Sequence, residues 1–401
     1  MRGFFSSSSV QRDSPGTLIP RCGACGLFRT CKSPKMKPYG KGKMGILVVG
    51  EAPGEKEDEK GRPFIGKAGQ HLRQVLGEIG IDLDRDAWTT NALICRPPKN
   101  KTPDSNQISH CRPNLLNTIR EYQPQVVITL GRSALDSILP QYWKGDIGAM
   151  ERWAGWRIPL PDFWLCPTFH PSYLLRMKNS LMDRLFETHL TMAFGISIAP
   201  PEQPKWNERV QILYDEKEIC REIQGADDSA RAEGSNGWLA VDYETNCLKP
   251  EWPEAKIFSC AISNAHRTIS YPWVGEAIVA TGRLLKSNRT KKIASNLKME
   301  ERWTLKTFGH GVANWGWDTM LASHCLDNRP HICGLKFQLF VKMGICSYNE
   351  SVEPYLASQD GPYNRIGEIS WKDLLLYGGL DALGEYRLAM KQRKEMGYEH
   401  D

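Results

Sequence analysis

A short apolar run that ends in a tight turn and a dense acidic segment constrains the fold of this chain more than any other stretch. The run is Ile46–Val49, which has the length and composition of a strand buried on both faces of a parallel sheet. Gly50 ends the run, and residues 51–54 (EAPG) turn the chain sharply. Ligands of open parallel sheets collect beyond the carboxyl ends of the strands. The turn is therefore a candidate site, and an ordinary polar loop is the alternative.

Three further apolar runs and three helical patterns alternate along the same half of the chain. The runs are Trp88–Ile94, Val126–Gly131 and Leu165–Phe169, and the helical patterns cover residues 67–79, 105–122 and 132–139. This alternation predicts an α/β unit with a parallel sheet. Glu51, Asn91 and His170 each lie at or just past the end of one run. Because parallel strands bring their carboxyl ends to one rim, we expect these three polar side chains to meet in a single site.

Cysteine spacing indicates a metal or cluster site in the same half. Cys22 and Cys25 are separated by two residues, and Cys95 and Cys111 form a second pair with fifteen residues between them. Four thiolates in two pairs can hold zinc or an iron–sulfur cluster, and spacing alone does not choose between them. Cys31 is a spare thiol that could replace one ligand. The alternative is that these residues are small buried apolar side chains.

Composition limits the class of protein. A chain of 401 residues exceeds the size of a single core, so two or three domains are expected. No apolar run approaches the length of a membrane span, and no signal-peptide core follows the first residues, which predicts a cytoplasmic protein without a membrane partner. Residues 1–200 carry a net charge of +9 and the remainder −3, which suits a polyanionic partner. Residues 32–43 hold five lysines and could track phosphates or be a solvated connector.

A second pattern of strands and carboxylates follows a proline-rich linker at residues 196–208. The strand predicted at Trp238–Val241 ends in Asp242 and Glu244, which project from one face and can share a divalent cation. Residues 292–300 have the pattern of a strand that leads to a third carboxylate, Glu300. A predicted helix then places Tyr377 and Asp381 four residues apart on one face.

The motif order in the first half resembles family 4 uracil-DNA glycosylases, the iron–sulfur type. CGAC, GEAPGEKED, GRPFIGKAG, TTNALICRPPKN, HC and FHPSYLLR follow one another across roughly residues 21–190. The resemblance implies a three-layer α/β/α fold that flips uracil out of DNA and hydrolyses its N-glycosidic bond. It also implies a [4Fe–4S] cluster, whose ligands would be Cys22, Cys25, Cys95 and Cys111.

The residue types suit the chemistry that this resemblance implies. A flipped base must be held on its face and on its pairing edge, and Phe64 can stack on the ring. The Asn91 amide can accept from uracil N3–H and donate to O4, whereas cytosine presents the opposite pattern. His170 can hydrogen-bond O2 and stabilise the anion that forms when the bond breaks.

The turn and its carboxylates complete this expected site. Gly50 and Ala52 would let the backbone approach the flipped nucleotide, and Arg176 would contact phosphates. Glu51 and Glu57 are candidates to orient water, to stabilise the sugar cation or to reject the methyl group of thymine, and sequence does not rank these roles. The other residues of the acidic run are expected to be solvated.

The carboxylates of the second half resemble the 3′–5′ exonuclease domain of the DEDD superfamily, found beside family A DNA polymerases. The resemblance covers about residues 208–395 and implies a ribonuclease-H-like fold. It implies two metal ions, Mg²⁺ or Mn²⁺, held by Asp242, Glu244, Asp381 and a middle carboxylate, with Tyr377 orienting the water. The middle position is usually Asp and is Glu300 here, which puts full catalytic competence in doubt.

The expected organisation is a disordered N-terminus at 1–20, a glycosylase domain at 21–195, a linker at 196–208 and an exonuclease-like domain at 209–401. Two DNA enzymes in one chain would fit a phage-type replication protein of the host cytoplasm, whose polymerase lies on a separate polypeptide or was truncated away. One alternative is a non-catalytic iron–sulfur DNA-binding accessory protein. Another is a zinc-stabilised protein.

Overall fold

The structure is a computed structural model that describes residues 18–232, 236–358 and 361–398. Contacts between Cα atoms divide the chain into two compact units, unit 1 (Met1–Pro201) and unit 2 (Glu202–Asp401), and the division falls within the expected linker. Most of the segment expected to be disordered, 1–20, lies outside the described residues. None of the described helices is both long and apolar enough to cross a membrane.

Unit 1 is built on a five-stranded sheet in the order β2-β1-β3-β5-β4. Four strands are parallel, and the short edge strand β4 is antiparallel to β5. The strands are β1 (Ile46–Gly50), β2 (Ala87–Asn91), β3 (Val126–Leu130), β4 (Ile158–Pro159) and β5 (Trp164–Thr168). The strand expected at 88–94 ends at Asn91, because the Ile94 carbonyl instead accepts from the Met36 amide. This hydrogen bond takes the chain out of the sheet immediately before Cys95.

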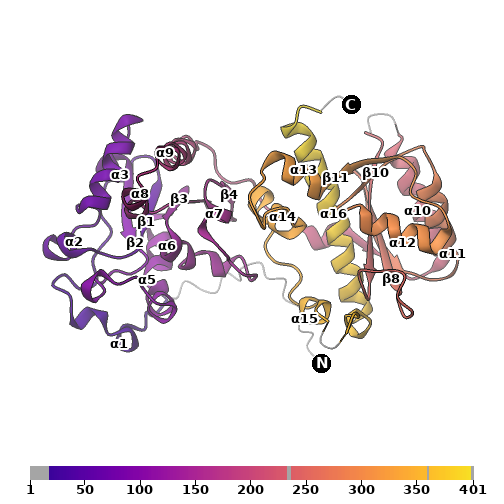
Figure 1. The fold of residues 1–401 in the computed structure, drawn as a ribbon, viewed down its shortest axis with the longest axis horizontal. Coiled ribbons are helices and arrows are strands. Elements are labelled where there is room, and N and C mark those ends of the chain that lie inside the picture. The colour runs from indigo at the N-terminus through magenta and orange to yellow at the C-terminus, as the bar shows by residue number, and fades with distance from the viewer. Residues whose placement is uncertain (1–17, 233–235, 359–360, 399–401) are drawn as a thin grey trace. The chain divides into compact units, whose positions relative to one another are not determined.

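Helices cover both faces of this sheet, which confirms the expected α/β/α layering (Figure 1). Ile46 and Val48 of β1 pack in one core with Leu72 of α3 and Phe186 of α9. Helices α5 and α6 lie on the opposite side in Figure 1. The helices are α1 (Cys22–Cys25), α2 (Glu55–Lys60), α3 (Lys67–Glu78), α4 (Leu83–Asp86), α5 (Ser105–Tyr122), α6 (Arg132–Asp136), α7 (Met150–Trp153), α8 (Pro171–Met177) and α9 (Ser180–Phe194).

The acidic run after β1 folds as helix α2, and the expectation that its remaining carboxylates are solvated is wrong for Asp58. That side chain is 2% exposed, and its two oxygens accept from the backbone amides of Lys32 (3.0 Å) and Ser33 (2.8 Å). A buried carboxylate needs such donors to offset its lost hydration. Asp58 therefore ties helix α2 to the start of the lysine-rich residues 32–43, the basic segment.

Unit 2 is built on a six-stranded mixed sheet in the order β11-β10-β7-β8-β9-β6. The strands β7, β8 and β9 form an antiparallel meander, and β10 and β11 are parallel to β7. The strands are β6 (Val210–Ile212), β7 (Trp238–Thr245), β8 (Ile257–Ser263), β9 (Thr268–Pro272), β10 (Lys291–Ala294) and β11 (Trp315–Asp318). An antiparallel meander extended by parallel strands is the ribonuclease-H-like arrangement expected from the sequence.

The two-residue period of β7 decides which helices each of its side chains meets. Leu239 and Val241 share a core with residues of α10, α11 and α12, whereas Trp238 and Ala240 pack with Tyr386 of α16. Asp242 and Glu244 continue the even-numbered face and therefore lie on the side of the sheet that α16 covers. The helices are α10 (Glu216–Ala230), α11 (Gly275–Lys286), α12 (Lys298–Phe308), α13 (Thr319–Leu326), α14 (Leu335–Met343), α15 (Glu353–Leu356) and α16 (Trp371–Glu395).

Two glycines let α16 lie directly on the sheet. A Cβ at Gly379 would collide with the Val210 side chain, and one at Gly378 would approach Glu244 Cγ to 3.1 Å. The absence of side chains at these positions brings the helix backbone close to β6 and β7. Tyr377 and Asp381, on either side of this contact, are thereby placed over the carboxylates of β7.

Candidate active sites and cysteine cluster

A pocket of about 750 Å³ opens at the carboxyl edge of the sheet of unit 1. Register pairs Gly50 with Asn91 and Leu130 with Thr168, so the ends of four parallel strands are level. The pocket is lined by the expected residues that follow these strands, Glu51, Ala52, Glu57, Phe64, Asn91, His170 and Arg176. The site predicted from three strand ends is therefore one cavity in the structure.

Gly50 creates the space in which Asn91 and Phe64 meet. A Cβ at Gly50 would collide with Asn91 Oδ1 and would come within 2.8 Å of Phe64 Cζ. Asn91 is 6% exposed, and no hydrogen bond to its side-chain amide is recorded within the described residues. A buried amide beside an aromatic ring has a donor and an acceptor to offer to a planar ligand.

Phe64 is held in a strained backbone conformation. Its φ is +55°, in the left-handed region that costs a non-glycine residue on the order of 1–3 kcal/mol. The Phe64 carbonyl accepts from Arg73 Nε at 3.1 Å, and a Cβ at Gly69 would collide with the Phe64 backbone. Helix α3 therefore holds the backbone of Phe64 in this conformation. Sequence analysis identified the aromatic residue but not this strain.

The two candidate carboxylates of the pocket have different partners. Glu51 Oε2 accepts from the Ser133 hydroxyl at 2.9 Å, and Ser133 is a buried residue of α6 that sequence analysis missed. Glu57 Oε1 accepts from the backbone amides of Ile65 (3.2 Å) and Gly66 (2.7 Å). Glu57 thus holds the loop that carries Phe64, whereas Glu51 has one side-chain partner at the pocket wall.

The surroundings of His170 set its tautomer. Its Nδ1 accepts from the Ser172 backbone amide at 3.2 Å as the cap of α8, so Nε2 carries the proton. Burial, together with the positive charge of Arg176, lowers the pKa of His170 to about 4. A neutral histidine with a free Nε2–H donor therefore faces the pocket at neutral pH.

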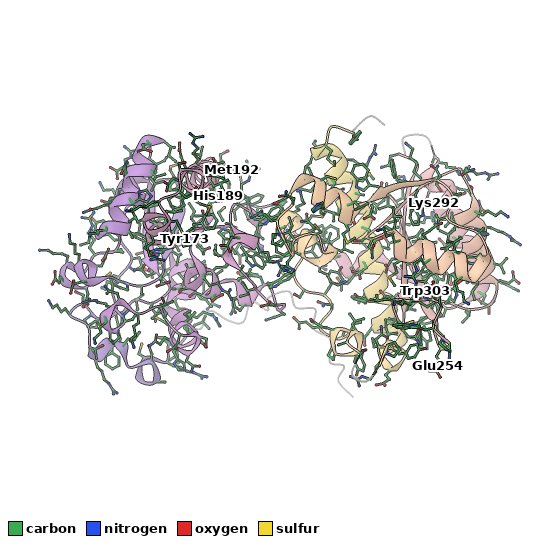
Figure 2. The ribbon with its side chains drawn as sticks, viewed as in Figure 1. Tyr173, His189, Met192, Glu254, Lys292 and Trp303 are labelled. Carbon is green, nitrogen blue, oxygen red and sulfur yellow. The ribbon has the colours of Figure 1, made fainter. Side chains whose placement is uncertain are left out.

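Aromatic and cationic side chains also line the pocket. Phe169 stacks with Tyr173 and with His189, which are both labelled in Figure 2. Arg176 is exposed and lines the pocket. Tyr39 of the basic segment pairs with Thr89 of β2 through the backbone, so part of this segment lies along the sheet.

The cysteines expected as ligands gather near the end of β2, where Cys22 and Cys25 are both neighbours of Cys111 and the spare thiol Cys31 is a neighbour of Cys95. Cys95 and Cys111 are buried in one small core with Cys25 and Cys31 packed against it. Cys95 Sγ accepts from the Lys35 amide at 3.3 Å, and Cys111 Sγ accepts from Asn114 Nδ2 at 3.4 Å. Burial raises the pKa of Cys95 to about 12, with Cys31 and Cys111 as neighbouring charges that add to the effect.

The arrangement of the cysteine sulfurs bears on which metal group they could hold. A tetrahedral zinc site with Zn–S bonds of about 2.3 Å needs sulfurs about 3.8 Å apart. Among the described residues, no three cysteine sulfurs lie within 4.8 Å of one another. The Lys35 amide and the Asn114 side chain donate to cysteine sulfur, as N–H groups do around iron–sulfur clusters.

A second centre is formed by carboxylates in unit 2. Oxygens of Asp242, Glu244 and Asp381 all lie within 4.8 Å of one another, a spacing that suits one divalent cation. Asp242 Oδ2 and Glu300 Oε2 are buried without a hydrogen-bond partner. Glu300 is 3% exposed in the first turn of α12 and lies outside the group of three.

Burial dominates the electrostatics of this centre. Burial, with the charge of Asp381 next, raises the pKa of Asp242 to about 7. The pKa values of Glu244 and Glu300 also lie well above the ordinary range for the same first reason, with Asp242 as the next contributor. Clustered buried carboxylates of this kind are stabilised by a cation. Glu385 of α16, which is 1% exposed, is a further acidic residue that sequence analysis did not identify.

A lysine that sequence analysis also missed enters this centre. Lys336 Nζ donates to the Tyr377 hydroxyl at 2.7 Å and to Asp381 Oδ2 at 2.8 Å. Burial lowers the pKa of Lys336, but the carboxylates led by Asp381 outweigh burial, and the net shift is upward. Tyr348 donates to Asp381 Oδ1 as well.

Comparisons with known proteins find different relatives for different parts of the chain. The Uracil DNA glycosylase superfamily matches residues 37–191. A type-4 uracil-DNA glycosylase of Pyrobaculum aerophilum is 36% identical over 183 residues, which cover 44% of this chain and 90% of that protein. The crystal structure of RNase D, an exoribonuclease of Escherichia coli, is matched with a TM-score of 0.36 and 10% identity, over 47% of this chain and 45% of that one. The fold of unit 2 rests on its own sheet topology.

One relative extends over both units. A DNA polymerase of Bacillus phage SP01 is 24% identical over 392 residues, which cover 89% of this chain and 40% of the polymerase. This chain thus spans less than half of that relative. The match over nine-tenths of the Pyrobaculum protein decides the family, and it falls on the unit that carries the pocket and the cysteines. Through unit 1, the chain belongs to the type-4 uracil-DNA glycosylases.

Proposed function

We propose that unit 1 excises uracil from DNA and that unit 2 is a metal-dependent 3′–5′ exonuclease. One observation supports the first activity most strongly. The Asn91 amide, the Phe64 ring and the Nε2–H of His170 converge on one pocket at the ends of parallel strands. Together they offer a stacking face, a donor, an acceptor and a second donor, which is what a flipped pyrimidine requires.

Recognition of uracil follows from the amide of Asn91. The side-chain oxygen accepts from N3–H and the amino group donates to O4. Cytosine reverses both groups, and each wrongly paired buried group costs about 1–3 kcal/mol. The fixed Phe64 ring stacks on the face of the base, so little conformational entropy is lost when the nucleotide enters.

Bond cleavage places negative charge on the base and positive charge on the sugar. Nε2–H of His170 donates to O2 as the base leaves, and its low pKa keeps it a neutral donor that needs no change of protonation. Glu51 is the carboxylate that we assign to the water or the sugar cation, with its orientation fixed by Ser133. Glu57 acts as a positioning residue through the loop amides that it binds.

The cysteines would hold a [4Fe–4S] cluster as a structural group beside the pocket. Cys22, Cys25, Cys95 and Cys111 are its proposed ligands, as in the family motif order. Its role would be to fix the segment between β2 and α5 relative to the basic segment, since Cys95 binds the amide of Lys35. Iron and sulfide in purified protein, with no zinc, support this group.

The acidic centre of unit 2 supports the second activity. A bound Mg²⁺ or Mn²⁺ would supply the charge that activates water and stabilises the leaving oxygen. Asp242, Glu244 and Asp381 would hold it, and Glu300 would extend the set. The hydroxyl of Tyr377 can orient a water at this centre.

The likeness to a phage DNA polymerase suggests the setting. A uracil-removing unit joined to an exonuclease would work beside a DNA polymerase, on DNA in the cytoplasm of a host cell. The polymerase would be on a separate polypeptide or on a longer form of this one. Co-purification with a polymerase from the same genome supports this setting, and repeated failure of the two to associate removes the separate-polypeptide version.

One assay tests both activities. A 5′-labelled oligonucleotide with a single uracil is incubated with the full chain, with and without Mg²⁺. Abasic sites that form without Mg²⁺ support the glycosylase, and a ladder that requires Mg²⁺ supports the exonuclease. An intact, iron-loaded protein that yields neither product would instead be a non-catalytic DNA-binding accessory protein.

A further inference from the structure

The ammonium of Lys336 lies inside the acidic centre of unit 2. Nζ is 2.8 Å from Asp381 Oδ2 and 3.1 Å from Oδ1. It also lies 2.7 Å from the hydroxyl oxygen of Tyr377. The Lys336 side chain is 31% exposed, and that of Asp381 is 9% exposed. The ammonium therefore contacts two of the groups that the exonuclease chemistry would use.

Two aromatic rings help to hold this ammonium. Nζ lies 4.5 Å from the centroid of the Tyr377 ring and 5.5 Å from that of Tyr348. The Tyr348 hydroxyl donates to Asp381 Oδ1. Cation–π attraction and charge-assisted hydrogen bonds both favour a cation at this point. As a result, both oxygens of Asp381 are already engaged by side chains.

Lys292, a buried lysine of unit 2, uses its ammonium differently from Lys336. Lys292, labelled in Figure 2, donates to the backbone carbonyls of Ser287 and Thr290. Its ammonium therefore closes a local turn. Lys336 instead comes from the first turn of α14 and reaches a carboxylate of α16, 45 residues away in the sequence.

The charges around Lys336 explain why a cation is retained there. Asp242 and Glu244 lie within 4.8 Å of Asp381, and Glu300 is buried with one oxygen unpaired. Removing several carboxylates from water together is unfavourable unless a positive charge compensates for them. Within the described part of the chain, the ammonium of Lys336 is the cation that pairs with a carboxylate of this group, that of Asp381.

We propose that Lys336 is a resident counter-cation of the acidic centre, so that a divalent ion must displace its ammonium before Asp381 can become a ligand. The centre then stays folded without metal and binds metal weakly, and loading becomes an exchange of one cation for another. This proposal rests on the proposed exonuclease only for the kind of ion concerned. It concerns the binding of the ion and not the cleavage of DNA.

A metal titration tests the exchange directly. Mn²⁺ is titrated by calorimetry into the full, cluster-loaded chain as wild type, Lys336→Met and Lys336→Gln, with Asp242→Asn as the baseline for other sites. Both Lys336 variants should bind Mn²⁺ at least about tenfold more tightly, because a positive charge about 3 Å from a ligand oxygen has been removed. Equal or weaker binding in both variants overturns the proposal.

Lys342→Met is the matched control. Lys342 lies on the same helix, and its ammonium pairs with Glu395 outside the acidic centre. The same substitution there should leave Mn²⁺ affinity unchanged. An equal gain in affinity in Lys342→Met would show that net charge rather than the position of Lys336 is responsible, and would overturn the proposal.

Thermal unfolding in chelator and in Mn²⁺ separates the exchange from a purely structural role. In chelator, Lys336→Met should melt below wild type, because the carboxylates lose their counter-ion. In saturating Mn²⁺ the difference should shrink or reverse. The same difference in both conditions contradicts the proposal. If the Lys336 variants gain affinity for Mn²⁺ but the wild-type protein never degrades DNA, the proposed exonuclease activity is wrong. The role of Lys336 as a counter-cation is still supported in that case.

Discussion

The pocket of unit 1 and the acidic centre of unit 2 differ in the groups that contact their carboxylates. In unit 1, Glu51 and Glu57 are each held by neutral donors, a hydroxyl and two backbone amides, and His170 is neutral. In unit 2, Asp242 and Glu244 face a third carboxylate and a lysine. The first site can bind a neutral base without any added ion, whereas the second needs a cation even to keep its charges together.

The two sites also differ in how the fold assembles them. The polar residues Glu51, Asn91 and His170 of the pocket follow the ends of neighbouring parallel strands, so the sheet brings them together. The acidic centre needs the middle of β7 and the face of α16, and Gly378 allows the two to approach closely. An edge site tolerates change in its loops, whereas a strand–helix site depends on packing. Four substitutions and one change of conditions test this contrast.

Asn91→Ala should have the largest effect on unit 1. Losing the amide that we propose to read both N3–H and O4 should lower kcat/KM for uracil excision by at least about 100-fold. Abasic-site formation on a uracil oligonucleotide measures the loss. Exonuclease activity of the same preparation is the control and should not change. Retained excision would mean that Asn91 does not read the base.

Asp242→Asn should give the opposite pattern. The substitution keeps the shape of the side chain but removes a charge from the group of three carboxylates, so Mg²⁺-dependent degradation should fall by at least about 100-fold. Uracil excision, measured on the same protein, should stay at the wild-type level. If excision falls as well, the two units are coupled, and the contrast drawn above fails.

Glu57→Gln and Glu51→Gln should differ. Glutamine at position 57 keeps an oxygen for the amides of Ile65 and Gly66, so excision should change by less than about tenfold. At position 51 the lost charge should reduce kcat by about 100-fold. Steady-state kinetics on the uracil oligonucleotide measure both. A larger loss for Glu57→Gln would reverse the assignment of the two carboxylates.

The smallest expected effect is in the pH profile of excision. His170 has a pKa near 4 in the folded protein, against 6.5 for a free side chain, so kcat should show no inflection near 6.5. Between these values only the unfolded chain binds the proton, so stability should fall as the pH drops from about 6.5 toward 4. A kcat profile that follows a group of pKa 6.5 would show that His170 titrates normally.

Local patterns were sufficient to predict much of unit 1. The run at Ile46–Val49 and the helical pattern at 105–122 became β1 and α5 with nearly the expected bounds. Because parallel strands share an edge, the positions of Glu51, Asn91 and His170 at strand ends were enough to place them in one pocket. The D-x-E pair and the Tyr377–Asp381 spacing likewise came together in unit 2, because the periods of a strand and a helix fix which face a side chain takes.

Contacts between distant segments were decided only by the tertiary structure. Sequence could not show that Ser133 would hold Glu51, that Asp58 would be buried against the amides of Lys32 and Ser33, or that Lys336 would contact Asp381. None of these residues belongs to a repeating pattern. Their roles depend on which surfaces the sheets and helices press together, and on the need of each buried charge for a partner.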